Sequence, residues 1–131
     1  MSMRVKNRGG YDKITSYKQL RFWITARQVS LKLVELSRKL PNEQIARIIV
    51  NQVLRSAFSV GANIAEGFGK YKGKEYARFI QVALGSARET EYWLDLLKDV
   101  YLRFVKETEE ILLINEQTIK MLVITLKSLR K

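Results

Sequence analysis

The chain has 131 residues, enough for one domain with a hydrophobic core of its own. Hydrophobic residues make up 47% of the chain, which excludes a disordered protein, and the absence of cysteine excludes a disulfide framework and thiolate chemistry. Histidine is absent too, so the commonest general base and metal ligand is missing. We therefore expect a protein that is not an enzyme, has no metal or other cofactor, and resides in a reducing cytoplasm.

Charge is the second strong signal in the composition. Lys and Arg number 24 against 13 Asp and Glu, which gives a formal net charge of +11 and a pI near 10.0. The excess is uneven, because residues 1–39 contain ten basic side chains and only Asp12 and Glu35 as acids. A balance of this kind favours a polyanionic partner, either RNA, DNA or an acidic membrane surface.

In chain order, residues 1–15 are expected to form a basic, flexible N-terminal arm, and residues 16–131 a single helical domain. The single proline, Pro41, ends the first helical pattern, and Asn42 is placed to cap the next helix. Glycines at 67, 69 and 73 break the pattern again. No strand pattern is evident. The expected helices span residues 17–40, 43–67, 74–102 and 107–129.

These four helices predict an all-α fold, an antiparallel up-down four-helix bundle. The short loop near Lys72 makes the second and third helices antiparallel neighbours, so residues at equal distances from it face each other. This count pairs Ala57 with Ala87, and Gly61 with Ala83. It also pairs Ile64 with Ile80 and Phe68 with Tyr76. Small residues then meet small residues, which predicts a close seam between the two helices.

The same count places polar residues at the flanks of the seam. Asn63 meets Gln81, which predicts a hydrogen bond, and Glu66 meets Arg78, which predicts an ion pair. We interpret these side chains as structural and not catalytic. The predicted seam residues are Ala57, Gly61, Asn63, Ile64, Glu66, Arg78, Ile80, Ala83 and Ala87.

The first and fourth helices have wider apolar arcs than a simple bundle needs. The first also has one polar stripe, formed at spacings of three and four by Lys18, Arg21, Thr25, Gln28, Lys32, Glu35 and Lys39. Because a four-helix monomer would leave part of the apolar surplus in water, we expect the protein to self-associate.

Two sequence blocks resemble a known family. The run Ser59 to Gly67, SVGANIAEG, resembles the motif S-[IV]-x-A-N-I-A-E-G, and Glu75 to Phe79 followed by Ala83 to Glu91 resembles the second block of the same family. This is the four-helix-bundle family of proteins encoded by intervening sequences of 23S rRNA genes. It is related to the accessory variability determinant (Avd) of diversity-generating retroelements. The resemblance covers residues 15–130 and leaves the basic arm unexplained.

What the resemblance implies is a bundle that assembles into a ring-shaped homopentamer. For the retroelement branch it also implies binding to nucleic acid and to a reverse transcriptase. The motifs mark the fold that both branches share, so they do not separate an Avd-like protein from an rRNA-insert protein.

The basic segments predict a nucleic-acid-binding protein that contacts phosphates without reading sequence. A tyrosine between lysines in the loop is suited to stacking on an unpaired base. The candidate contacts lie on the arm, the first helix and the loop, and are Arg4, Lys6, Arg8, Lys18, Arg21, Lys32, Lys39, Lys70, Tyr71, Lys72 and Lys74.

Three alternatives remain. The same charges would suit a protein–protein adaptor for an acidic partner. Carboxylates on the third helix (Glu89, Glu91, Asp95, Asp99) are a possible magnesium site, but nearby Arg88 and Lys98 favour surface pairing instead. Membrane binding is not expected, because Trp23 lies on the arc of the first helix that should meet the core.

Overall fold

The computed structural model describes residues 4–7, 10–70 and 73–131, with side chains from residue 13 onward. Four long helices dominate it: α1 (Arg21–Lys39), α2 (Gln44–Phe68), α3 (Gly73–Val100) and α4 (Val105–Leu129). Short 3₁₀ turns precede α1 and α4, as η1 (Tyr17–Gln19) and η2 (Leu102–Phe104). Two strands, β1 (Arg4–Asn7) and β2 (Gly10–Lys13), lie at the N-terminus.

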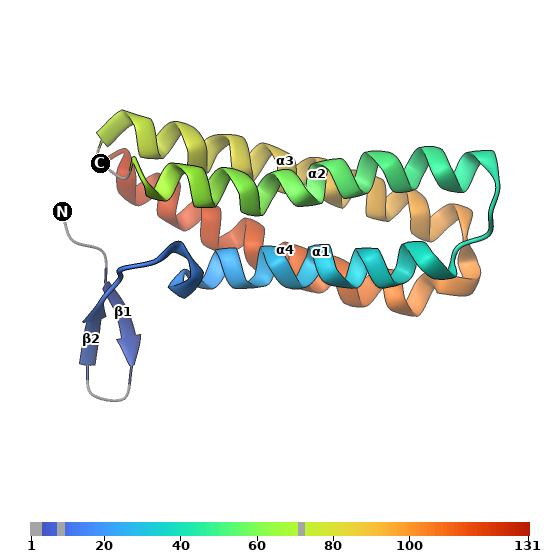
Figure 1. Cartoon of the computed structure of the whole chain (residues 1–131), viewed down its shortest axis with the longest axis horizontal. Helices are drawn as coiled ribbons and strands as arrows, with labels where there is room; N and C mark the ends of the chain where they lie inside the picture. The colour runs from blue at the N-terminus through green and yellow to red at the C-terminus, as the bar shows by residue number, and fades with distance from the viewer. Residues whose placement is uncertain (1–3, 8–9, 71–72) are drawn as a thin grey trace.

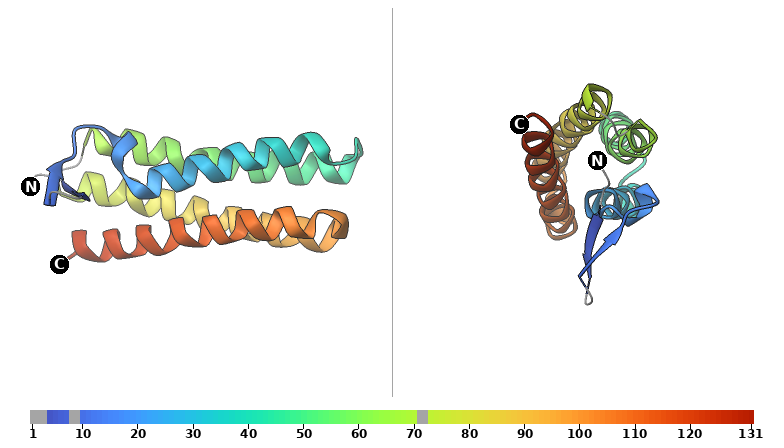
Figure 2. Two further views of the ribbon diagram at one scale, coloured as in Figure 1. Left: turned by 90° about the horizontal axis from the view of Figure 1, so that it is seen from below. Right: turned by 90° about the vertical axis from the view of Figure 1, so that its left-hand side faces the viewer.

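The helices form the predicted antiparallel four-helix bundle (Figure 1). Each helix packs on two others, so that α1 lies against α2 and α4, and α3 lies against the same two helices (Figure 2). Both chain termini and the two strands lie at one end of the bundle. The neighbours are therefore those of an up-down bundle with short connections.

The helix boundaries agree with the expected ones within a few residues, with one difference in kind. The first helix was expected from residue 17, but Ser16 caps the separate turn η1, with its Oγ accepting from the Lys18 amide at 3.2 Å. Gln19 completes a capping box. Leu20 is extended, so α1 begins only at Arg21.

The expected cap of the second helix was also wrong. Glu43 is the N-cap of α2, and its side chain makes no capping hydrogen bond. Because the helix begins one residue later than a cap at Asn42 requires, the Asn42 side chain accepts instead from Arg47 Nη1 at 2.9 Å.

The arm contains secondary structure that the sequence analysis did not anticipate. β1 and β2 pair antiparallel, with Arg4 opposite Lys13 and Lys6 opposite Tyr11. Strands of four residues with mixed polarity carry no clear alternation, which is why the pattern did not reveal them. Residues 8–9, including the candidate Arg8, lie outside the described residues.

A polar layer crosses the middle of the bundle and separates two hydrophobic clusters. On α4, Asn115 lies between Ile111 of one cluster and Ile119 of the other, and its Nδ2 donates to the Ala87 carbonyl at 2.9 Å. The layer is completed by three hydroxyl pairs: Ser56–Thr90 at 2.9 Å, Ser59–Ser86 at 3.0 Å and Thr25–Thr118 at 2.6 Å.

The hydroxyl pairs between α2 and α3 follow the predicted register to within about two residues. Five of the predicted seam residues are buried in the two clusters: Ala57, Ile64, Ile80, Ala83 and Ala87.

Gly61 does not face α3, which corrects its place in the predicted seam. A Cβ added at Gly61 would lie 3.7 Å from Trp23 Nε1, in ordinary van der Waals contact, so this position faces the indole of α1. The close approach of α2 and α3 occurs at Gly67, where a Cβ would lie 2.5 Å from the Phe79 Cβ. Gly67 is therefore a packing residue within α2, which ends at Phe68, one residue beyond the expected end.

Neither predicted polar pair at the flanks is formed. Asn63 Nδ2 donates to the Ser59 carbonyl at 2.8 Å, one turn back on its own helix, and Gln81 Oε1 accepts from Arg130 Nη2. Arg78 lies 3.6 Å from Glu75 on α3, while Glu66 is exposed and joins none of the ion pairs within the described residues. Asn63 and Arg78 found partners one turn away on their own helices, and Gln81 found one at the end of α4.

Candidate nucleic-acid interface

The positive charge is concentrated in one half of the bundle. The Thr25–Thr118 and Ser59–Ser86 contacts mark the middle of the bundle. We call the half on the side of the chain termini the hairpin half; it comprises residues 1–27, 59–86 and 117–131. This hairpin half contains 15 Lys and Arg against three Asp and Glu. The far half, residues 28–58 and 87–116, contains nine against ten. The net charge of the protein therefore resides in the hairpin half.

A groove in the hairpin half gathers four of these cations. It lies between the first turns of α3 and the last turn of α4, has a volume of about 450 Å³, and we call it the basic groove. Because α3 begins and α4 ends here, their macrodipoles oppose each other, and the side chains decide the sign of the potential. The charged and polar residues that line it are Lys74, Arg78, Gln81, Arg130 and Lys131.

Several contacts hold these cations in place. The Arg130 guanidinium donates to Gln81 Oε1 across the groove, which joins α4 to α3. The Arg78 guanidinium lies 4.9 Å from the centroid of the Phe79 ring, and Lys70 Nζ lies 5.3 Å from the same centroid. Since both cations contact one ring, the loop lysine extends the positive surface from the groove.

The predicted loop residues thus fall partly on this surface. Lys70 and Lys74 are exposed there. Tyr71 and Lys72 lie outside the described residues.

The stripe on α1 is divided between the two halves. Lys18 and Arg21 are exposed in the hairpin half, whereas Lys32 Nζ lies 2.8 Å from Glu110 Oε1 of α4. The hydrogen bond and charge of Glu110 raise the pKa of Lys32, and Lys32 in turn lowers the pKa of Glu110. Lys39 lines a groove together with Glu107 and Glu110 of α4. Lys32 and Lys39 are therefore not brought together with the basic groove.

The arm candidates Arg4 and Lys6 both lie on β1, at the same end of the molecule as the basic groove. Their partners across the ribbon are residues 13 and 11.

The sequence analysis missed the contribution of the C-terminus. Arg130 and Lys131 line the basic groove, and Arg78, which we had assigned to the seam, lines it too. A signal was present: no acidic residue follows Glu116, while Lys120, Lys127, Arg130 and Lys131 do. In an up-down bundle the end of the fourth helix lies beside the start of the third, so these charges were bound to meet those of residues 70–78.

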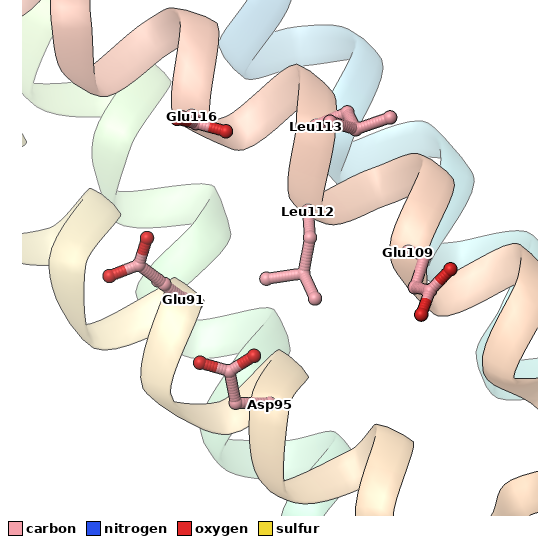
Figure 3. A pocket seen from close by; sticks show the side chains of 6 residues that line it. All are labelled: Glu91, Asp95, Glu109, Leu112, Leu113 and Glu116. Atoms are coloured by element: carbon pink, nitrogen blue, oxygen red, sulfur yellow. The ribbon is translucent and has the colours of Figure 1, made fainter.

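The far half contains an acidic groove instead, of about 330 Å³, between α3 and α4 (Figure 3). Glu91 and Asp95 line it from α3, Glu109 and Glu116 from α4, with Leu112 extending between the two helices. Asp95 lies 3.8 Å from Lys98, and Glu116 lies 3.4 Å from Lys120. No cluster of three or more Asp or Glu in the described part of the chain is arranged to hold a metal ion.

Glu89, the remaining carboxylate considered on α3, bonds to Arg55 and to Trp93 Nε1. The indole of Trp23 is half-buried and stacks edge-on with Tyr17 at a centroid distance of 5.2 Å. Within the described residues, the structure has no helix with an apolar stretch long enough to span a bilayer.

Comparison with known proteins gives a family match and similar solved structures. The family model described as 23S rRNA-intervening sequence protein matches residues 18–124. A crystal structure from Bacteroides thetaiotaomicron, of a protein with unknown function from the S23 ribosomal protein family, is similar with a TM-score of 0.73 and 30% identity. That match covers 81% of this chain and 98% of the other. No curated protein sequence matches. Since the family model spans most of the bundle, this chain belongs to the family of 23S rRNA-intervening sequence proteins.

Proposed function

We propose that this protein is a non-enzymatic nucleic-acid-binding protein, and that it contacts phosphates through the hairpin half of its bundle. The observation that carries the proposal is the excess of 15 cations over three acids in that half. Few acids are available to pair with these cations, so most of them are left to bind an external anion.

The basic groove supplies the central contacts. Arg78 and Arg130 have planar guanidinium groups that bind two phosphate oxygens at once, while Lys74 and Lys131 act as point charges. Lys18, Arg21 and Lys70 are exposed in the same half of the bundle and add further cations. Contacts of this kind recognise the backbone of RNA or DNA and are independent of base sequence.

The protein is proposed to act as an oligomer, and the family resemblance favours a ring of five copies. Exposed apolar residues on α4 support self-association, since Leu113 is 63% and Ile124 is 67% exposed. Repeating the basic surface around a ring would raise affinity for a long polyanion through multivalency.

Within the family we favour an Avd-like role, as an accessory protein of a diversity-generating retroelement with a reverse transcriptase as its protein partner. The support is the motif resemblance together with the basic surface. A reverse transcriptase gene and a variable-repeat target gene beside this one would bear it out. Location inside an rRNA operon would contradict it.

Salt titration with matched variants tests the binding itself. The full chain is titrated into a labelled 30-nucleotide RNA or DNA and followed by fluorescence anisotropy. The test variant neutralises the basic groove with Lys74→Gln, Arg78→Gln, Arg130→Gln and Lys131→Gln. The control removes four exposed cations of the far half with Arg38→Gln, Lys39→Gln, Arg47→Gln and Lys106→Gln.

We expect native binding to weaken steeply with salt, because cations that contact phosphates release condensed counterions. The groove variant should bind about a hundredfold more weakly, with a salt slope smaller by about 4, and the control should change affinity by less than about threefold. Equal losses in both variants would contradict a localised interface. Absence of any salt-dependent binding would overturn the function, and capture of an acidic protein that survives nuclease would then identify the chain as an adaptor.

A further inference from the structure

The N-terminal hairpin stands apart from the rest of the molecule. β1 and β2 pair with each other, and the ribbon projects from the end of the bundle (Figures 1 and 2). The matched family region begins at residue 18, so the hairpin lies outside it. An isolated two-stranded hairpin is at best marginally stable in water, which favours a role completed by a ligand.

The root of the ribbon is held firmly. Ile14 follows the last residue of β2 directly and is only 9% exposed, within the hydrophobic cluster of the hairpin half. The next two backbone amides, of Thr15 and Ser16, donate to Gln19 Oε1 at 2.7 and 3.0 Å. The ribbon is therefore attached at a fixed position, one residue from the core.

The register places the cations of the ribbon on one face. Directly paired residues of an antiparallel ribbon share a face, and successive residues alternate between faces. With Arg4 opposite Lys13 and Lys6 opposite Tyr11, one face carries three cations and a tyrosine. The other carries Val5, Asn7, Gly10 and Asp12.

The dimensions of this ribbon fit one kind of nucleic acid. The major groove of B-form DNA is about 12 Å wide and admits a two-stranded ribbon, whose strands lie about 4.8 Å apart. The major groove of A-form RNA is deep and narrow. We propose that the hairpin enters the major groove of duplex DNA with its cationic face, while the basic groove holds the neighbouring phosphates. The proposal rests on the nucleic-acid-binding function above and specifies its substrate.

A protein strand added to an edge of the ribbon is the competing possibility. The cations argue against it, because they lie on a face of the ribbon, whereas strand addition uses the backbone groups of an edge. The ribbon and the basic groove lie at the same end of the bundle.

The test uses the full chain with 24-base-pair duplexes of DNA and of RNA of the same sequence. Dimethyl sulfate reports the groove contact, since guanine N7 lies in the major groove. The hairpin variant replaces the cations with a residue that suits strands, as Arg4→Thr, Lys6→Thr and Lys13→Thr. A control removes three exposed cations of the far half, as Arg38→Gln, Arg88→Gln and Lys106→Gln.

We expect the native chain to protect guanine N7 and to prefer duplex DNA over duplex RNA. The hairpin variant should lose the protection, bind DNA about tenfold more weakly and show a salt slope smaller by about 3, while the control resembles the native chain. Circular dichroism of each variant confirms that the bundle is folded.

Two failures can be told apart. Binding that depends on the basic groove, but leaves guanine N7 unprotected or is indifferent to the hairpin variant, overturns the inference and leaves the proposed function standing. Absence of salt-dependent binding to any nucleic acid overturns both.

Discussion

The hairpin half and the far half of the bundle are built from the same four helices but use their charges differently. In the far half, acids and bases are nearly equal in number, and ion pairs join helices, as Lys32 to Glu110 and Arg55 to Glu89. In the hairpin half, three acids stand against 15 bases, and among the described residues the ion pair of Arg78 is with Glu75 of its own helix. The charges of the far half are therefore largely neutralised within the molecule, whereas those of the hairpin half remain exposed to solvent.

Gly67 and Gly85 test how closely the hairpin half is packed. Gly67→Ala should lower the free energy of unfolding by about 2–3 kcal/mol, because its Cβ would lie 2.5 Å from the Phe79 Cβ. Gly85 has no atom within 4 Å of an added Cβ, so Gly85→Ala should raise stability by about 0.5–1 kcal/mol. Urea unfolding measures both, and equal effects would mean that α2 and α3 are not in close contact at Gly67.

The polar layer tests whether the two halves are separate cores. Asn115 is 2% exposed and donates to the Ala87 carbonyl, so Asn115→Ala should lower the free energy of unfolding by about 2 kcal/mol. Asn115→Leu keeps the side-chain volume and joins the two apolar clusters. The free energy of unfolding of this variant should therefore fall by less than about 1 kcal/mol. A larger loss in the leucine variant would show that the hydrogen bond, and not the volume, stabilises the layer. Denaturant unfolding of both variants measures these two changes in the free energy of unfolding.

One tyrosine in each half has a raised pKa, which predicts how the stability of the protein changes at alkaline pH. Burial raises the pKa of Tyr76 to about 12, and burial and the Glu43 carboxylate raise that of Tyr101 to about 12. Both folded pKa values lie above the ordinary 10.0, so these contributions to stability are complete below pH 10 and are lost as the pH rises through 12. The Tyr76 hydroxyl has no hydrogen-bond partner among the described residues.

Tyr76→Phe should therefore raise the free energy of unfolding at pH 7 by about 1 kcal/mol, because a buried unpaired hydroxyl is removed. It should also reduce the loss of stability above pH 10. Denaturant titrations between pH 7 and 11 measure both effects, with Tyr101→Phe as the variant of the far half. A lower stability for Tyr76→Phe at pH 7 would mean that the hydroxyl is satisfied.

The smallest effect is expected for the ion pair Lys32–Glu110, since both groups are solvated. Lys32 lowers the pKa of Glu110, so the pair contributes above the ordinary carboxylate pKa of 4.5 and the contribution is lost as the pH falls through the lowered value. NMR titration of the Glu110 carboxyl carbon should give a midpoint below 4.5 that returns toward it in Lys32→Gln. An unchanged midpoint in the variant would mean that the pair is absent in solution.

Periodicity and loop length were enough to predict the bundle, its helix boundaries and the α2–α3 register, because each follows from spacing along one chain segment. Side-chain partners were harder. Asn63 and Arg78 each had a choice of partners: Asn63 bonds to Ser59 one turn back, and Arg78 lies nearer to Glu75 on its own helix. The hairpin was too short for its alternation to be visible.

The binding surface could be predicted only in part. Lys18, Arg21, Lys70 and Lys74 do lie in the hairpin half. Lys32 differs from them because Glu110, 78 residues away in sequence, lies beside it in the fold. Charge counts along a segment cannot reveal such neighbours. The up-down topology, applied to the C-terminal cations, would have placed them beside residues 70–78.

The contact between Gly67 and Phe79 links the two family motifs, because it limits which residues fit where α2 meets α3. The glycine ends the first motif and the phenylalanine ends the opening run of the second. Because the clash is with the Cβ of residue 79, which every residue except glycine has, a smaller side chain at 79 does not make room at 67, so position 67 should stay glycine among relatives that keep this helix spacing. A library that diversifies both positions should therefore recover glycine at 67, whichever apolar residue it selects at 79.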